Sequence, residues 1–229
     1  MTLPLLISVP HAGLKVPPEV KELCALTEEQ IVEDGDEGAA EIYSLQEEVA
    51  SFVTTHIARA IVDLNRAEDD RRADGVVKTH TIWEVPVYRE PLSDESVETL
   101  LARYHRPYHQ QLSTLAKKAK LGVDCHTMAA IGPPVASDAG KRRPLLCLSN
   151  GDGTCPDTWL KQLAESFERA FQIEVSTNFP FKGGHVIRSH AHELAWVQVE
   201  LSRAPFLSND QKRSCIFKAL TGWGEFSGV

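Results

Sequence analysis

Two histidines stand at the ends of apolar segments that read as buried strands. His11 follows the run Leu3 to Val9 directly after Pro10, and His126 follows the run 121–125. Open α/β sheets place their sites at the C-terminal ends of strands. Two imidazoles brought together there could hold one divalent metal, with a carboxylate as third ligand and a fourth position open for water. Taken singly, each histidine could equally cap its strand through hydrogen bonds alone.

Three aspartates are candidates to complete such a metal site. Asp34 and Asp36 come just before a predicted helix, and either one could supply the third ligand. Asp124 stands two residues before His126 and could orient that imidazole by accepting a hydrogen bond from it. The spacing alone leaves the choice between Asp34 and Asp36 open.

Asn65 and Arg66 leave a predicted strand and enter a long loop. A guanidinium binds a carboxylate through two parallel hydrogen bonds, and an asparagine amide can add a third. This pair could therefore hold an acidic substrate. The alternative is an arginine engaged in a surface salt bridge.

Glu200 lies within the apolar stretch 196–201. Because side chains alternate along a strand, Gln198 and Glu200 point to the same face. A carboxylate in apolar surroundings either has a structural partner or is kept at a raised pKa as a general base. Both interpretations remain open from the sequence.

Further histidines gather in the second half of the chain. His105 and His109 are one helical turn apart, which is a ligand spacing, but no glutamate follows His105 as in the zinc-protease motif H-E-x-x-H. We therefore favour a structural role for that pair. A stretch that begins with two glycines carries His185, Arg188 and His190, and it could line an anion pocket or form a solvated loop.

Several other chemistries lack their sequence signatures. The chain contains no G-x-G-x-x-G, Walker or G-x-S-x-G motif, which argues against dinucleotide, nucleoside-triphosphate and serine-hydrolase sites. Cys125 is a poor nucleophile candidate because it would face away from its neighbour His126 in a strand. The five cysteines form no C-x-x-C pair and are expected to be reduced thiols.

The elements that must position these residues alternate between strand and helix patterns. Thr27 and Gln30 resemble a capping box that opens a short helix. The expected strands are 3–9, 52–55, 60–64, 121–125, 145–148, 173–176 and 196–201. The expected longer helices are 38–49, 93–120 with a kink at Pro107, 159–171 and 210–220, and a long loop covers 66–93. This alternation predicts an α/β fold with helices on both faces of a largely parallel sheet.

Composition narrows the class of protein. The chain has 229 residues, 42% of them hydrophobic, and a net charge of −8. We expect a single domain over 1–229. No basic stripe favours nucleic acid, and no apolar run approaches the roughly 20 residues of a membrane span. Without the pattern of a secretory signal, a cytoplasmic protein is expected.

The ordered motifs of the chain together resemble the N-formylglutamate amidohydrolase family, which looks related to the zinc carboxypeptidases and aspartoacylases. The resemblance is carried by SVPHAG (8–13), DGD (34–36), VDLNR (62–66), DCHT (124–127), KGGHVIR (182–188) and QVELSR (198–203). It implies a three-layer α/β/α sandwich with a mixed sheet. The chain departs from the family in its shorter length, in Gly38 and in His185, where an aromatic residue is commoner.

The resemblance also implies roles for individual residues. His11, Asp36 and His126 would bind one zinc ion, and Glu200 would be the general base. The substrate would be held by Asn65 and Arg66, with Arg188 and His190 as further candidates. The implied reaction is hydrolysis of an N-acyl acidic amino acid such as N-formyl-L-glutamate by a monomer or small homo-oligomer. The alternatives are a deacylase or carboxypeptidase-like hydrolase of another small carboxylate, and a catalytically silent metal-binding relative.

Overall fold

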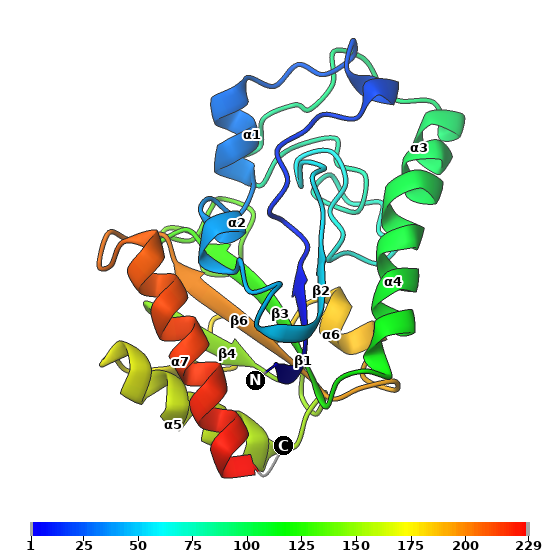
Figure 1. Cartoon of the computed structure of the whole chain (residues 1–229). Helices are drawn as coiled ribbons and strands as arrows, with labels where there is room; N and C mark the ends of the chain where they lie inside the picture. Colours follow the sequence, from blue (N-terminus) through cyan, green and yellow to red (C-terminus); the bar gives the residue numbers. More distant parts are fainter. Residues whose placement is uncertain (1, 228–229) are drawn as a thin grey trace.

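A six-stranded mixed sheet runs through the computed structural model, which describes residues 2–227 (Figure 1). The strand order is β2-β1-β3-β6-β4-β5, and every neighbouring pair is parallel except β4 and β6. The strands are β1 (Leu3–Val9), β2 (Val49–Thr54), β3 (Leu121–Met128), β4 (Leu146–Ser149), β5 (Ser176–Thr177) and β6 (Trp196–Ser202). The predicted mixed, largely parallel sheet is confirmed.

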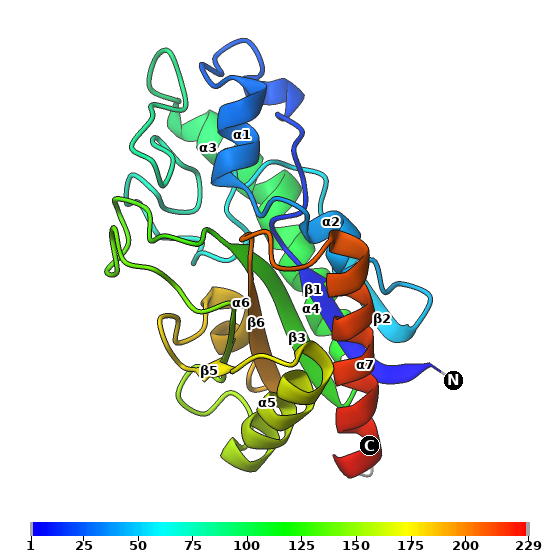
Figure 2. The same ribbon diagram turned by 90° about the vertical axis from the view of Figure 1, so that its left-hand side faces the viewer.

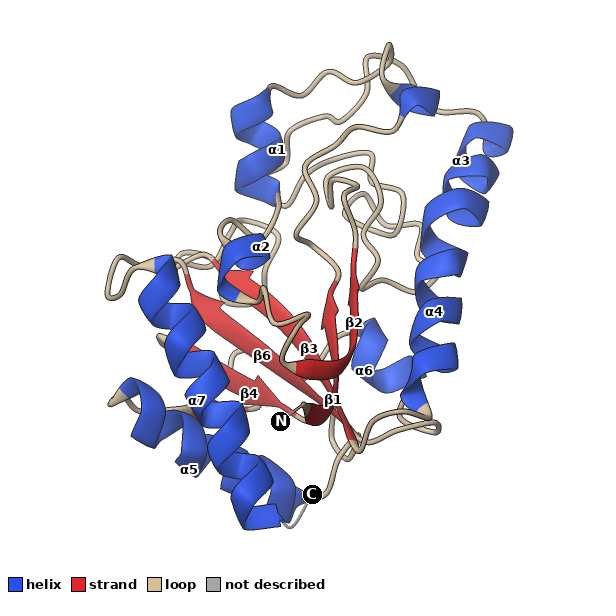
Figure 3. Ribbon diagram, viewed as in Figure 1, coloured by secondary structure: helices blue, strands red, loops and turns tan. Residues whose placement is uncertain are grey.

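Helices cover both faces of this sheet (Figures 1 and 2). One layer consists of α2 (Ala39–Ile42), α5 (Asp157–Phe171) and α7 (Asn209–Ser227). The other consists of α3 (Asp94–Leu100), α4 (Arg106–Ala116) and α6 (His185–Ser189). A 3₁₀ turn (Pro18–Val20) and α1 (Glu28–Asp34) lie beyond the sheet, among the loops (Figure 3). The three-layer architecture is as predicted.

Alternation along the strands divides their side chains between two faces of the sheet, each with its own buried apolar cluster. Val123 and Cys125 of β3 belong to the apolar cluster that includes α5 and α7. Asp124 and His126 therefore face the opposite layer, on the side of α4 and α6. Burial raises the pKa of the Cys125 thiol, in keeping with its expected inert role.

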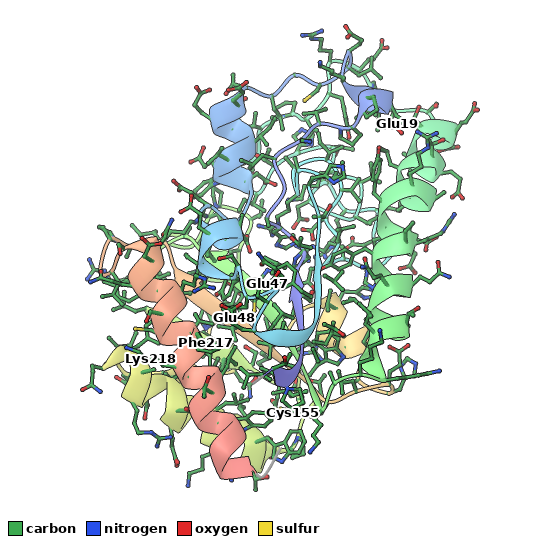
Figure 4. All side chains as sticks on the ribbon, viewed as in Figure 1. Glu19, Glu47, Glu48, Cys155, Phe217 and Lys218 are labelled. Atoms are coloured by element: carbon green, nitrogen blue, oxygen red, sulfur yellow. The ribbon has the colours of Figure 1, made fainter. Side chains whose placement is uncertain are left out.

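The helix expected over 38–49 is wrong beyond its first turn. Gly38 precedes α2 with a φ of 79°, and α2 ends at Ile42. Arg213 of α7 donates hydrogen bonds to the carbonyl of Ser44 and to Glu48, which holds the chain in a turn before β2. Glu48 is labelled beside α7 in Figure 4. The apolar residues of this segment fit a helix in sequence, but tertiary contacts with α7 and β1 override that pattern.

Other boundaries also differ from the expectation. Residues 60–64 form turns with a single bridge between Val62 and Val77, and the strand expected at 173–176 is the short β5. Between α3 and α4 the helix widens into a π-helical turn (Leu101–His105) just ahead of Pro107, which has no N–H to donate. His126 lies inside β3, which is longer than expected.

A long segment without helix or strand joins β2 to α3, as predicted for residues 66–93. In Figure 1 it fills the region between α1 and α3. Lys78 anchors the segment, because its buried ammonium donates to Asp34 at the end of α1 over 2.8 Å. Within the described residues, no helix has the length and apolar character needed to cross a membrane.

Candidate metal centre

Three predicted ligands converge at one point near the C-terminal ends of β1 and β3. His126 Nδ1 lies 3.0 Å from Asp36 Oδ2 and 3.1 Å from His11 Nδ1, and His11 Nδ1 lies 3.4 Å from Asp36 Oδ2. All three residues are buried. A tetrahedral ion with bonds of about 2.0–2.1 Å separates its ligand atoms by about 3.3 Å. The three atoms therefore have the spacing that a zinc-like ion requires.

In each imidazole, the ring nitrogen that faces away from the shared point contacts a carboxylate. His11 Nε2 is 2.8 Å from Asp63 Oδ1, and His126 Nε2 is 2.8 Å from Asp124 Oδ2. Since an ionised carboxylate can only accept, each Nε2 carries a hydrogen, and Nδ1 is the atom through which each imidazole would bind a metal at the shared point. Such carboxylate–histidine pairs fix the tautomer and orientation of metal-binding imidazoles.

The orienting contacts continue toward α4. Ser8 Oγ donates to Asp124 Oδ1 over 2.7 Å, and the Tyr108 hydroxyl lies 2.8 Å from Ser8 Oγ. Tyr43 of the opposite layer donates to the His126 carbonyl over 2.7 Å. Both helical layers thus hold the position of His126.

The structure distinguishes between the two aspartates that sequence left open. Asp34 pairs with Lys78 and accepts from the Ile82 N–H over 2.7 Å, so its oxygens are occupied. Asp36 instead faces the two imidazoles and accepts from the Thr127 N–H over 3.1 Å. Asp36 is therefore the carboxylate that completes the cluster.

Charge within the cluster changes the protonation of its members. Burial alone would raise the pKa of Asp36, but the adjacent His11 and His126 imidazoles outweigh it and hold that pKa below its usual value. Burial would likewise lower the pKa of His126, yet Asp124 and Asp36 raise it well above its ordinary range. Without a metal, a proton on this cluster offsets the buried negative charge.

Glu200 lies beside His126, because the two residues are register partners on neighbouring parallel strands. Gln198 is in register with Asp124 and donates from Nε2 to Glu200 Oε1 over 2.8 Å. Burial raises the pKa of Glu200 to about 7, against the lowering effect of His126. A carboxylate with that pKa can accept and release a proton near neutral pH.

Asn65 and Arg66 border the same site. Asn65 Nδ2 lies 3.2 Å from His126 Nε2, and Asn65 Oδ1 accepts from the Val186 N–H over 2.7 Å. Arg66 donates to Asp74 over 2.9 Å and is 29% exposed in its side chain. Part of the Arg66 side chain is therefore accessible to an anion, although its guanidinium already pairs with Asp74.

The converging side chains meet in one cavity of about 310 Å³. Its wall includes every proposed ligand, Glu200, Asn65 and Arg66, but neither Arg188 nor His190. Arg188 instead donates to backbone carbonyls of 151, 182 and 183. His190 packs against His109 and bonds Glu193. The predicted substrate role of these two residues gains no geometric support.

Sequence reasoning missed several residues of the cavity. Asp63 stands out in the sequence only as part of the Asn-Arg segment, yet it backs His11 and accepts from Arg59 Nε over 3.1 Å. Arg59 precedes Asp63 by four residues, a spacing that could have suggested their pairing. Arg143, which pairs with Asp138 and stacks over Phe181, adds another cation to the wall.

The glycine-rich stretch near residue 184 folds differently from the solvated loop considered above. It forms the short helix α6, whose Val186 and Ile187 are buried against the sheet. His185 at its start lies near His105 and His109 rather than at the metal centre.

Comparison with known proteins places these features in a family. The model of the family described as N-formylglutamate amidohydrolase matches residues 3–207. The N-formylglutamate deformylase of Pseudomonas aeruginosa is 29% identical over 224 residues, covering 89% of this chain and 82% of the relative. The N-formylglutamate deformylase of Pseudomonas putida is 28% identical over 227 residues, covering 91% of this chain and 84% of the relative. The crystal structure of N-formylglutamate amidohydrolase from Ralstonia eutropha JMP134 aligns with a TM-score of 0.81 at 19% identity, covering 100% of this chain and 96% of that one.

Proposed function

Because the chain belongs to the N-formylglutamate amidohydrolase family, we propose that it is a metal-dependent amidohydrolase that releases formate from N-formyl-L-glutamate. The observation that carries this proposal is the convergence of His11, Asp36 and His126 in the cavity that also contains Glu200. The names of the Pseudomonas relatives support N-formylglutamate as the substrate.

His11, Asp36 and His126 would hold the metal, which we propose to be zinc. Two imidazoles and one carboxylate, with one position left open, are a donor set found in catalytic zinc sites. When bound, such an ion polarises a substrate carbonyl and lowers the pKa of water toward about 7. Asp63 and Asp124 keep both imidazoles in the tautomer that presents Nδ1.

Glu200 would act as the general base and then as the general acid. It takes a proton from the attacking water and returns the proton to the leaving amine. Gln198 holds one of its oxygens, which fixes the direction of the carboxylate. Burial keeps its pKa at about 7, so both proton transfers are feasible near neutral pH.

Asn65 and Arg66 would bind a carboxylate of the substrate. Asn65 is fixed by the Val186 N–H, and its amide lies beside His126. The Arg66 guanidinium would exchange part of its contact with Asp74 for the substrate. Holding the carboxylate in this way places the scissile carbon beside the metal ligands.

A substrate panel tests the proposal. Purified protein with added zinc is assayed for amine release from N-formyl-L-glutamate, N-acetyl-L-glutamate, N-formyl-L-leucine and a dipeptide with C-terminal glutamate. We expect the formyl compound of glutamate to be hydrolysed fastest, and a chelator to abolish the reaction. Faster turnover of the acetyl compound or the dipeptide would identify a deacylase or carboxypeptidase. Zinc binding without hydrolysis of any compound would refute an enzymatic role.

A further inference from the structure

A second group of histidines lies outside the cavity of the metal centre. His105 ends the π-helical turn, His109 is one turn further along in α4, and His185 begins α6. Each ring offers one nitrogen within 4.8 Å of the others. The ring centroids of His105 and His109 are 4.4 Å apart, and those of His109 and His185 are 5.2 Å apart. We call these three residues the histidine cluster.

His105 leaves a buried nitrogen without a partner. Its side chain belongs to a residue only 3% exposed, and its Nε2 lies 2.9 Å from the Arg66 carbonyl. A carbonyl can only accept, so Nε2 carries the hydrogen and Nδ1 has the lone pair. Within the described residues, Nδ1 has no hydrogen-bond partner. A buried acceptor left in this state is unfavourable, and a ligand at Nδ1 would satisfy it.

The tautomer of His109 follows from its hydrogen bonds. Its Nε2 donates to the Leu64 carbonyl over 3.0 Å, so its Nδ1 is the acceptor. His190 Nε2 lies 2.9 Å from that nitrogen, and His190 Nδ1 lies 2.8 Å from Glu193 Oε2. His109 therefore presents a lone pair that a metal could take over from His190.

His185 supplies the accessible member of the cluster. Its residue is partly exposed, and within residues 2–227 its ring forms no hydrogen bond. An ion could reach the cluster from this side, which a buried metal site needs. Its ring nitrogens are also free to turn toward an ion without breaking an existing hydrogen bond.

The protonation state of the cluster suits a metal. Burial lowers the pKa of all three imidazoles, that of His109 to about 3. Neutral imidazole is the form that binds transition metals. The carboxylates of Asp63, Glu68 and Asp69 act on the cluster from nearby and favour a cation, although Arg106 opposes them at His105.

We propose that His105, His109 and His185 form a second zinc site, separate from the one at His11, Asp36 and His126. Three imidazoles with water in the fourth position are a known zinc coordination. Although such an open coordination is typical of catalytic zinc, the cluster lies outside the cavity of the metal centre and contacts the backbone of the segment that carries Asn65 and Arg66, so we assign the ion a stabilising role. His105 and His109 bond the carbonyls of Arg66 and Leu64, and the His185 N–H donates to the Asn65 carbonyl over 3.4 Å. An ion there would tie α4 and α6 to this segment.

Zinc stoichiometry tests the proposal without reference to activity. Metal-free wild type, His185→Gln and the control His192→Gln are titrated with Zn²⁺ by calorimetry at neutral pH. His192 is a suitable control because its side chain is 75% exposed and lies outside the cluster. We expect wild type and the control to bind one zinc ion more per chain than His185→Gln. Saturating zinc should also raise their Tm further than that of the variant.

The zinc stoichiometries of wild type and His185→Gln together distinguish a failure of this proposal from a failure of the proposed function. If wild type binds two zinc ions per chain and His185→Gln binds one, both sites are supported. If wild type binds one ion and His185→Gln binds none, only the site at the histidine cluster is supported. Equal stoichiometry in wild type and His185→Gln would overturn the second site. His109→Gln provides an independent variant, and circular dichroism checks that each protein is folded. Equal stoichiometry in that variant as well would likewise exclude an ion bound at the cluster.

Discussion

Glu200 is the residue whose removal should separate catalysis from metal binding. Glu200→Gln keeps the shape and the Gln198 contact but cannot take a proton, so kcat should fall by about 10²–10⁴-fold. Zinc content should stay the same, because Glu200 is not one of the three converging ligands. Steady-state hydrolysis of N-formyl-L-glutamate and metal analysis of the same sample measure both effects.

The control for this substitution is Glu47→Gln, which makes the same change on an exposed residue before β2 (Figure 4). Its kcat should match wild type. A Glu200→Gln protein with wild-type turnover would show that another group moves the proton.

The raised pKa of Glu200 predicts the acid side of the pH profile. Burial brings this pKa to about 7, and the general base works only when ionised. The value of kcat/KM should therefore fall tenfold per pH unit below that pKa. Initial rates at substrate concentrations far below KM, measured from acid to neutral pH, give the profile. A plateau that extends down to about 4.5, the range of an ordinary glutamate, would contradict the burial argument.

Arg66 and Arg188 are both candidates in the sequence for binding the substrate carboxylate, and the structure separates them. Arg66 lines the cavity, whereas Arg188 does not, because its guanidinium donates to the backbone carbonyls of 151, 182 and 183. Arg66→Lys should raise KM about 10-fold or more, because lysine cannot form the bidentate contact. Arg188→Lys should leave KM within a factor of about two. A larger KM effect from Arg188→Lys would restore the sequence-based assignment.

At the level of elements, Lys78 joins the long segment before α3 to the end of α1. Its fully buried ammonium pairs with Asp34, two residues before the proposed ligand Asp36. Lys78→Met keeps most of the side-chain volume but leaves a buried carboxylate without its partner. The free energy of unfolding should fall by about 3–5 kcal/mol. Urea denaturation measures this loss.

Two further variants make the test of Lys78 specific. Adding Asp34→Asn to Lys78→Met removes the unpaired charge and should recover part of the stability. Lys161→Met changes an exposed lysine on α5 and should stay within about 0.5 kcal/mol of wild type. If Lys78→Met is as stable as Lys161→Met, the buried pair is not an anchor.

The elements show how far the sequence alone could predict the fold. The long apolar runs and the periodic pattern of α5 predicted β1, β3, β6 and that helix, because burial on one or both faces leaves a strong pattern. The helix expected over 38–49 was wrong because a contact from Arg213, 165 residues from Glu48 along the chain, holds a turn there instead. No local pattern reports such a contact.

The candidate site, like the fold, could be predicted from the sequence only where strand positions decide it. His11, His126 and Glu200 could be proposed from their positions in strands, since parallel strands bring their C-terminal ends together. The spacing alone did not choose between Asp34 and Asp36; the family resemblance favoured Asp36, and the pairing of Asp34 with Lys78 supports that choice. The partner of His11 is Asp63, which approaches from 52 residues away. The histidine cluster likewise depends on how α4 packs beside α6. These contacts arise from packing rather than from spacing.

For the molecule as a whole, neither the net charge nor the charge balance of the cavity attracts an anionic substrate. A chain with a net charge of −8 repels an anionic substrate at long range. The cavity wall contains five cationic side chains, Arg59, Arg66, Lys182, Arg143 and Arg203, but also five carboxylates, Asp36, Asp63, Asp74, Asp138 and Glu200. The proposed acidic substrate would therefore be recognised through individual short-range contacts, such as one with Arg66, rather than through an excess of positive charge in the cavity.

The buried charges at the centre of the sheet link the stability of the whole protein to pH and metal. In the metal-free protein the pKa of His126 is raised above its unfolded value of about 6.5, chiefly by Asp124. That stabilisation is complete below about 6.5 and is lost as the pH rises through the folded-state pKa. Zinc has the opposite dependence, because it binds the deprotonated imidazoles and binds them more tightly as pH rises.

The difference in Tm between zinc-loaded and chelator-treated protein should therefore widen from about pH 6 to about pH 8. Scanning calorimetry of both forms measures this difference in Tm, and in His126→Asn the difference should no longer change with pH. If the difference in wild type stays constant or narrows as the pH rises, His126 does not exchange a proton for the metal.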